Sequence, residues 1–145
     1  MKFDKIIVDG RHVLWRTTDA FRDLHVELDD GSTIPTGGIY GTLGILIRIH
    51  ARYGGAIVFA WEGAGNFRER IFQGYKGRDR PIEPERASLV SEMSNQERIL
   101  VALLSDLGIA QFKGKGCEAD DVIGRLVNEA ADNGEKCVIY SGDSD

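Results

Sequence analysis

Three acidic residues stand close together in the segment GCEADDVIGRLV, residues 116–127. Glu118, Asp120 and Asp121 directly precede an apolar pattern with helical spacing. Acids in the first turn of a helix are stabilised by the helix dipole, by roughly 0.3–1 kcal/mol each, and this local explanation requires no function. A divalent metal ion is the other explanation, because a cation offsets the repulsion between neighbouring carboxylates. This segment alone leaves both explanations open.

Four more acids follow predicted strands elsewhere in the chain: Asp9, Glu62, Asp143 and Asp145. Asp9 ends the apolar run KIIVDG, Glu62 follows AIVFAW, and the last two follow KCVIYSG. In parallel α/β sheets, ligands bind beyond the carboxyl ends of the strands. The helix dipole does not account for acids that follow strands. We therefore expect all seven acids to gather at one edge of the sheet.

Such a carboxylate cluster, without His or Cys, is a hard-oxygen site suited to Mg²⁺ or Mn²⁺. Several carboxylates can hold two ions roughly 3.5–4 Å apart, which is the spacing used for in-line phosphodiester hydrolysis. One ion lowers the pKa of the attacking water, and both stabilise charge on the phosphate. The predicted metal ligands are Asp9, Glu62, Glu118, Asp120, Asp121, Asp143 and Asp145.

The segment 62–86 is rich in Gly, Pro and charge and reads as an exposed connection. Its basic and aromatic residues include Arg68, Arg70, Tyr75, Lys76, Arg78, Arg80 and Arg86. Arg and Lys neutralise phosphates, and Tyr75 or Phe67 can stack on an unpaired base. Acids are interleaved, so a solvated loop is the simpler reading in isolation, whereas beside a metal cluster phosphate contact is favoured. Arg16 is as consistent with an ordinary surface residue as with phosphate contact.

Strand and helix patterns alternate along the chain. Strands are predicted at 5–10, 56–61, 108–114 and 136–145, helices at 11–24, 36–54, 87–107 and from about 118 to 133, and two short extended pieces within 26–35. This alternation predicts a mainly parallel sheet covered by helices on both faces, a three-layer α/β domain. Within the second helix, Ile39, Leu43, Leu46 and Ile47 are expected to share one apolar face.

The composition fits one soluble globular domain spanning residues 1–145, with 42% hydrophobic and 28% charged residues. No apolar run reaches the roughly 18 residues of a membrane helix. Cys117 and Cys137 form no CxxC or Cys/His pattern, which argues against a zinc site and fits a reducing cytoplasm. The net charge of −5 argues weakly against a polyanionic partner. The seven clustered acids carry more negative charge than this total, so the rest of the chain is mildly basic.

The motifs IIVDG…R, FR…YK, EADDVI and SGDSD, in this order, resemble the 5′→3′ exonuclease and flap endonuclease family. That family includes the 5′ nuclease domain of bacterial DNA polymerase I and phage relatives, and its fold is PIN-like. The resemblance runs across essentially the whole chain, and WEG…NFR resembles the phage members in particular. It implies two-metal hydrolysis of DNA near a 5′ end or flap, with a metal-bound water as the nucleophile.

The resemblance also implies roles for single residues. Asp9, Glu62, Glu118 and Asp120 resemble ligands of a first metal, Asp143 and Asp145 serve a second, and Asp121 acts through water. Lys76 resembles the lysine that contacts the scissile phosphate, so the implied catalytic set is Lys76, Asp9, Glu118 and Asp120. Residues 67–86 would lie in or near an arch for the 5′ single strand. The expected nucleic-acid-binding residues are Arg16, Arg68, Tyr75, Lys76, Arg78 and Arg80.

Three departures from the family pattern modify these expectations. Glu62 stands where family members usually have Asp. Asp79 stands where they have an arginine, so Arg78 or Arg80 would have to substitute for that arginine. The sequence stops at Asp145, where family members continue into further acids and a helix–three-turn–helix module. We therefore expect a C-terminally shortened nuclease whose last strand has an exposed edge. The alternatives are a catalytically poor nucleic-acid-binding module, half of a split nuclease completed by a second chain, or a small PIN-type ribonuclease acting on RNA.

Overall fold

The computed structural model describes residues 2–65, 67–72 and 83–142. Its elements, in chain order, are β1 (Lys5–Asp9), α1 (Gly10–Ala20), β2 (His25–Glu27), β3 (Thr33–Pro35), α2 (Gly37–Tyr53), β4 (Ala56–Trp61), α3 (Phe67–Ile71), α4 (Pro84–Asp106), β5 (Ala110–Lys113), α5 (Ala119–Asp132) and β6 (Cys137–Tyr140). Most of the predicted elements are present. The first helix, however, ends four residues before the predicted boundary, and a short helix, α3, lies within the segment that was expected to be a connection.

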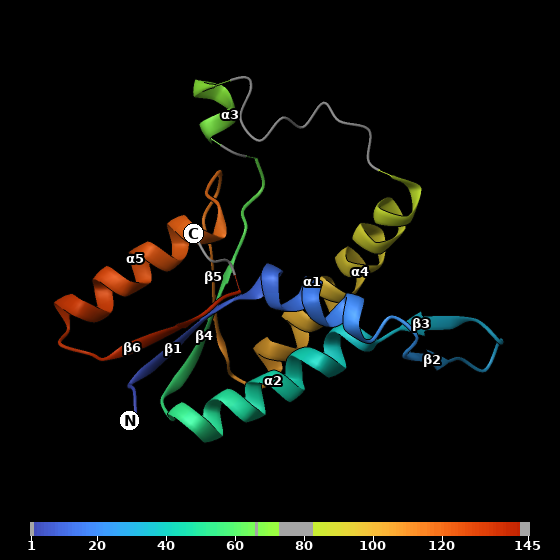
Figure 1. The fold of residues 1–145 in the computed structure, drawn as a ribbon, viewed down its shortest axis with the longest axis horizontal. Coiled ribbons are helices and arrows are strands. Elements are labelled where there is room, and N and C mark those ends of the chain that lie inside the picture. Colours follow the sequence, from blue (N-terminus) through green and yellow to red (C-terminus); the bar gives the residue numbers. More distant parts are fainter. Residues whose placement is uncertain (1, 66, 73–82, 143–145) are drawn as a thin grey trace.

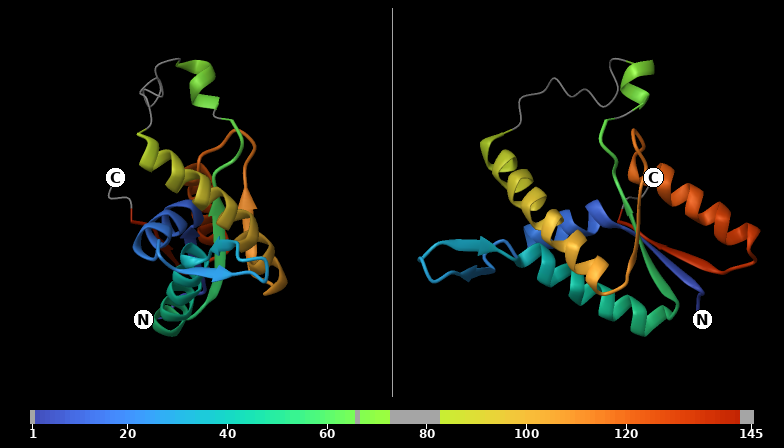
Figure 2. Two further views of the ribbon diagram at one scale, coloured as in Figure 1. Left: turned by 90° about the vertical axis from the view of Figure 1, so that its right-hand side faces the viewer. Right: turned by 180° about the vertical axis from the view of Figure 1, so that it is seen from behind.

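Four strands form a parallel sheet in the order β5-β4-β1-β6 (Figure 1). Lys5 of β1 is in register with Ala56 of β4 on one side and with Cys137 of β6 on the other. The central position of β1 brings the carboxyl ends of β4 and β6 next to its own. The short strands β2 and β3 pair with each other as an antiparallel hairpin. This hairpin and α5 lie at opposite ends of the molecule in both views of its broad faces (Figures 1 and 2).

Each face of the sheet packs on a separate core, which produces three layers. Side chains alternate along β1, so that Ile6 and Val8 join a core with residues of α1, α2 and α4, whereas Ile7 packs with α5. In β4, Phe59 and Val58 divide between the same two cores. Helix α5 lies on one side of the sheet, and α1, α2 and α4 lie on the other (Figure 1). The predicted three-layer α/β architecture is therefore confirmed.

The buried side of α2 includes three residues of the predicted apolar face, since Leu46 is buried and Ile39 and Leu43 pack against the same core. Ile47 is 72% exposed, and the buried residues of the helix include Gly38, Thr42, Leu46 and Ile49. Small residues are among them because α1 approaches closely: the hydroxyl of Thr17 donates to the carbonyl of Gly38 over 3.0 Å. Apolarity alone predicted the wrong side at Ile47, because close packing of two helices selects small side chains.

A buried amide from α4 holds the start of α2. The side-chain oxygen of Gln96, a residue only 2% exposed, accepts hydrogen bonds from the backbone N–H groups of Gly38 (2.7 Å) and Ile39 (3.3 Å). These N–H groups belong to the first helical turn, where no intrahelical acceptor is available. Gln96 therefore ties α4 to α2.

Strand β6 lies at one edge of the sheet. Among the described residues, no strand pairs with its outer edge, and Ile139 is 48% exposed. None of the helices in the described ranges combines the length and apolar character needed to cross a membrane.

Candidate active site

Asp9 occupies the centre of the site because it ends the central strand and begins the first helix. Its Oδ1 accepts the backbone N–H of His12 over 3.0 Å, which makes Asp9 the N-cap of α1. Its Oδ2 accepts the hydroxyl of Ser141, just beyond β6, over 3.3 Å. The side chain is buried, with 7% exposed. Hydrogen bonds to both oxygens thus fix the direction of the carboxylate.

Glu62 and Glu118 approach one another because the loops that carry them are joined by backbone hydrogen bonds. Gly63 N–H donates to Cys117 C=O over 2.9 Å, and Gly116 N–H donates to Ala64 C=O over 3.1 Å. A Cβ at Gly63 would lie only 1.7 Å from the carbonyl oxygen of Gly114, so this approach requires glycine. The loop after β4 is therefore held against the start of α5.

Four predicted metal ligands line one shared cavity of about 200 Å³ at the carboxyl edge of the sheet. They come from the end of β1, the loop after β4 and the start of α5; the lining residues are Asp9, Arg11, His12, Glu62, Glu118, Ala119 and Asp120. Glu118 is buried, with 8% exposed. The gathering of acids from separated segments at the carboxyl edge, expected from the sequence, is seen for these four. Asp143 and Asp145 lie outside the described residues.

The donor chemistry of this cavity fits a hard divalent cation, since carboxylate oxygens are the ligands that Mg²⁺ and Mn²⁺ favour. Burial of the charged groups Asp9 and Glu118 is costly unless opposite charge or hydrogen bonds compensate. Within residues 2–65, 67–72 and 83–142, no group of three or more Asp, Glu, His or Cys side chains stands ready to hold one ion. Part of the negative charge is balanced by Arg11, whose Nη1 lies 3.0 Å from Oε2 of Glu62.

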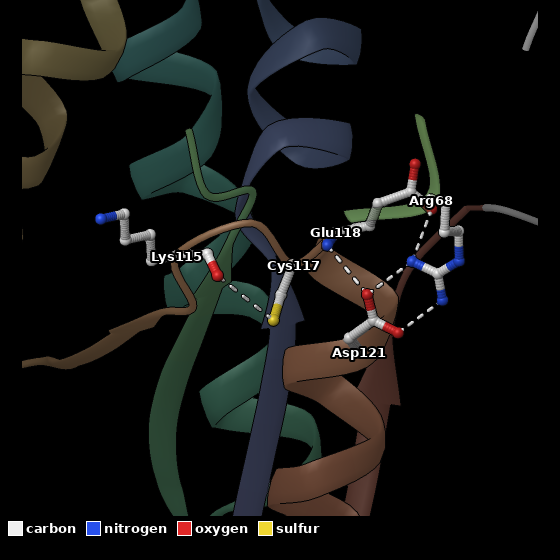
Figure 3. A network of polar contacts seen from close by, with 5 residues as sticks. All are labelled: Arg68, Lys115, Cys117, Glu118 and Asp121. Carbon is white, nitrogen blue, oxygen red and sulfur yellow. Dashed lines mark hydrogen bonds and ion pairs between the residues drawn. The ribbon is translucent and has the colours of Figure 1, made fainter. Parts of the chain in front are cut away.

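Asp121 pairs with Arg68, which also reaches Glu118 (Figure 3). Two guanidinium nitrogens of Arg68 donate to the two oxygens of Asp121, over 2.7 and 2.6 Å. Arg68 also lies 3.4 Å from Oε2 of Glu118. The hydrogen bond from Arg68 holds the pKa of the Asp121 carboxyl below its ordinary value, and the backbone N–H of Glu118 adds to this effect. Asp121 is not among the described residues that line the carboxylate cavity.

The predicted nucleic-acid-binding residues fall into two groups. Arg68 is half-buried beside the acids at the start of α5, and Arg16 is exposed on α1 but is not among the described residues that line the carboxylate cavity. Tyr75, Lys76, Arg78 and Arg80 lie outside the described residues. Their roles remain predictions.

Three residues at the site were not singled out from the sequence. Arg11 immediately follows the Asp9-Gly10 pair, and its pairing with Glu62 could have been suspected from that position. His12 lines the cavity, and its Nε2 is buried and has no hydrogen-bond partner among the described residues. Ser141 reaches Asp9 only because β6 pairs with β1, and the sequence carries no signal for that pairing.

Comparison with known proteins decides the family. A family model described as "5'-3' exonuclease, N-terminal resolvase-like domain" matches residues 4–145. The chain belongs to this family. It is 33% identical over 143 residues to a 5'-3' exonuclease of Buchnera aphidicola subsp. Acyrthosiphon pisum, and the match covers 97% of this chain and 46% of the relative. It is 28% identical over 141 residues to the thermostable DNA polymerase I of Thermus aquaticus, covering 97% of this chain and 16% of that protein.

Several solved structures share the fold. A phage T5 protein co-crystallised with metal ions superimposes with a TM-score of 0.75 at 17% identity, over 97% of this chain and 49% of that one. A bacteriophage T5 flap endonuclease in a complex with DNA and metal ions gives a TM-score of 0.70 at 17% identity and the same coverage. Human GEN1 bound to Holliday junction DNA gives 0.58 at 19% identity, over 99% of this chain and 33% of that one. The chain thus has the PIN-like fold and spans about half the length of the T5 proteins and of the Buchnera exonuclease.

Proposed function

We propose that this chain carries the metal-binding part of a 5′→3′ exonuclease or flap endonuclease that hydrolyses DNA phosphodiester bonds. The observation that carries the proposal is the single cavity at which Asp9, Glu62, Glu118 and Asp120 meet. Membership of the 5'-3' exonuclease family supports it. Further support comes from the T5 flap endonuclease, which shares the fold and was crystallised with DNA and metal ions.

The four carboxylates of the cavity would hold a first divalent ion, Mg²⁺ or Mn²⁺, and Asp143 and Asp145 would serve a second. When bound, such ions lower the pKa of a water molecule and stabilise charge on a phosphate. Asp9 is suited to its part because His12 N–H and the Ser141 hydroxyl orient its two oxygens. Outer hydrogen bonds of this kind fix metal-ligating carboxylates in proteins.

Arg11 holds Glu62 with an ion pair of 3.0 Å at the wall of the cavity. A guanidinium at this position offsets the negative charge of the cavity and can also contact a phosphate of the substrate. Lys76, Tyr75, Arg78 and Arg80, together with Arg68 and Arg16, would contact the DNA backbone or its bases beside the 5′ end. The substrate would be DNA with a 5′ single strand or flap, acted on in the cytoplasm.

Two other functions remain to be tested against this one. One alternative is a module that binds nucleic acid and cleaves it poorly or only with a second chain. A PIN-type ribonuclease would have the same cavity but would prefer RNA.

Cleavage of a 5′-labelled DNA flap by the full chain, after EDTA treatment and titration with Mg²⁺ or Mn²⁺, tests the proposal. We expect metal-dependent cleavage by wild type, loss of cleavage in Asp120→Ala, and normal cleavage in Asp132→Ala, an exposed acid at the far end of the same helix. Stronger cleavage of a matched RNA flap would assign the ribonuclease function. Binding of the flap without cleavage under either metal would contradict the enzyme proposal for this chain.

A further inference from the structure

The carboxylate of Asp121 is occupied by hydrogen bonds from Arg68 and from the backbone of Glu118. Its Oδ2 accepts Arg68 Nη1 over 2.7 Å and the backbone N–H of Glu118 over 2.9 Å, and its Oδ1 accepts Arg68 Nη2 over 2.6 Å (Figure 3). A carboxylate has about four lone-pair positions, and these bonds take three of them. Asp121 lines a different cavity, of about 210 Å³, together with residues of β5 and α5 such as Phe112 and Arg125.

The rotation between neighbouring helix positions explains why Asp120 and Asp121 point in different directions. Successive residues of an α-helix are rotated by about 100°, since 3.6 residues make one turn. Asp120 therefore faces the carboxylate cavity, and Asp121 faces Arg68. The sequence prediction of a metal-ligand role acting through water did not take account of this rotation.

Arg68 connects the short helix α3 to the edge of the site. Its guanidinium lies 4.7 Å from the centre of the Phe67 ring and 3.4 Å from the Glu118 carboxylate, which lines the carboxylate cavity. The backbone N–H of Phe67 donates to Gly116 C=O over 3.0 Å, so α3 is also fixed at its start. The guanidinium of Arg68 is thus held close enough to contact a ligand that binds beside Glu118.

A bidentate carboxylate partner restricts a guanidinium far more than a single contact does, because both planes must align. An unrestrained arginine has several rotatable bonds and loses side-chain entropy when it is fixed. Asp121 imposes that restriction before any ligand arrives. The Arg68 side chain is still 30% exposed, so part of it remains accessible from solvent.

We propose that Asp121 is a positioning residue that holds Arg68 beside the metal-binding acids, and that it is not itself a metal ligand. This inference rests on the proposed function, because Arg68 is held there to face a phosphate of the substrate. Asp121 also caps α5 through the Glu118 N–H, and this structural part of its role is separable by mutation.

The substitution Asp121→Asn separates the capping role from the pairing with Arg68. The amide oxygen can still accept the Glu118 N–H, whereas the charged bidentate pair is lost. Mn²⁺ affinity of the EDTA-treated full chain is then measured by calorimetry. We expect Asp121→Asn to stay within about threefold of wild type, and Asp120→Asn to lose roughly tenfold or more. An equal loss in Asp121→Asn and Asp120→Asn would overturn the proposal and make Asp121 a metal ligand.

Hydrogen exchange of the metal-free chain provides a second readout that does not depend on activity. Asp121→Asn and Arg68→Gln should each speed amide exchange in residues 67–72 by about two- to fivefold, and the double variant should show no further increase. Asp132→Asn, at the other end of α5, serves as the control. Unchanged exchange in both single variants would contradict the positioning role. Wild type that binds no Mn²⁺ but shows these exchange effects would refute the proposed function while leaving the link between Asp121 and Arg68 intact.

Discussion

The hydroxyl of Ser141 donates a hydrogen bond to Oδ2 of Asp9 over 3.3 Å, and it joins the ends of two neighbouring parallel strands. The bond spans 132 positions of sequence. Two elements consequently orient the Asp9 carboxylate: the first turn of α1 and the residue that follows β6. Asp143 and Asp145 come two and four residues after Ser141 in the sequence.

Removing this hydrogen bond should weaken metal binding without unfolding the chain. We expect Ser141→Ala to lower Mn²⁺ affinity by about tenfold, since outer-sphere partners orient carboxylate ligands. Calorimetry on the full chain measures the effect. Ser94→Ala, which removes an exposed hydroxyl that donates to the Val90 carbonyl of its own helix, is the matched control. If Ser141→Ala binds Mn²⁺ like wild type, Asp9 does not depend on this bond.

Close packing of α2 against α1 should make Gly38 intolerant of a side chain. A Cβ at this position would lie 2.4 Å from Oγ1 of Thr18 and 2.8 Å from Cδ1 of Leu14. We expect Gly38→Ala to lower the free energy of unfolding by about 1–3 kcal/mol. In the same helix, a Cβ at Gly44 would lie near only one atom, Arg48 Nη1 at 3.5 Å. Gly44→Ala should therefore raise the free energy of unfolding by about 0.5–1 kcal/mol. Urea denaturation compares the two, and equal effects would disprove the packing argument.

The side-chain amide of Gln96 should contribute to the free energy of unfolding, because its oxygen accepts the N–H groups of Gly38 and Ile39. Gln96→Met keeps the size of the side chain but leaves the buried N–H of Gly38 without its 2.7 Å acceptor. An unsatisfied buried donor costs about 1–3 kcal/mol. Thermal or urea unfolding should reveal a loss of that size. Asn95→Met, an exposed neighbouring amide, should change stability by less, and a comparable loss in both variants would show that Gln96 is not acting as a cap.

The lowered pKa of Asp121 predicts an acid-dependent loss of stability. The folded pKa lies below the unfolded value of 3.8, so the stabilising pair with Arg68 is complete above that value and is lost as the pH falls below it. The pair is partly exposed, so we expect about 0.5–1 kcal/mol. Urea unfolding at pH 5 and at pH 3 should show a larger decrease for wild type than for Asp121→Asn. The same decrease in both proteins would mean that the pair contributes nothing to stability.

The sequence allowed the site to be anticipated where a simple geometric rule applied. Parallel strands end at a common edge, so Asp9 and Glu62 were expected to meet the acids at the start of α5, and they do. Strand order was not accessible, because nothing local in KCVIYSG indicates which neighbour the strand will choose. The contact between Ser141 and Asp9 was unpredictable for this reason.

Other details depend on packing between distant segments. Whether an arginine of a charged loop faces solvent, phosphate or an acid cannot be read from composition, and Arg68 pairs with Asp121 across 53 positions of sequence. The exposed position of Ile47 shows the same limit, since α1 selects small residues at its contact with α2. The different directions of Asp120 and Asp121, in contrast, follow from helical rotation and were available from the sequence.

The location of the divalent ion is the central claim, and Mn²⁺ line broadening in the NMR spectrum of the ¹⁵N-labelled full chain tests it most directly. Paramagnetic Mn²⁺ at the cavity should broaden the amide signals of Gly10 and Ala119 first and leave that of Gly31, at the tip of the β2–β3 hairpin, sharp. Asp9→Asn, which preserves the cap of α1, should abolish this selective broadening, whereas Asp132→Asn should not. Broadening centred elsewhere in the chain, or unchanged in Asp9→Asn, would contradict the account.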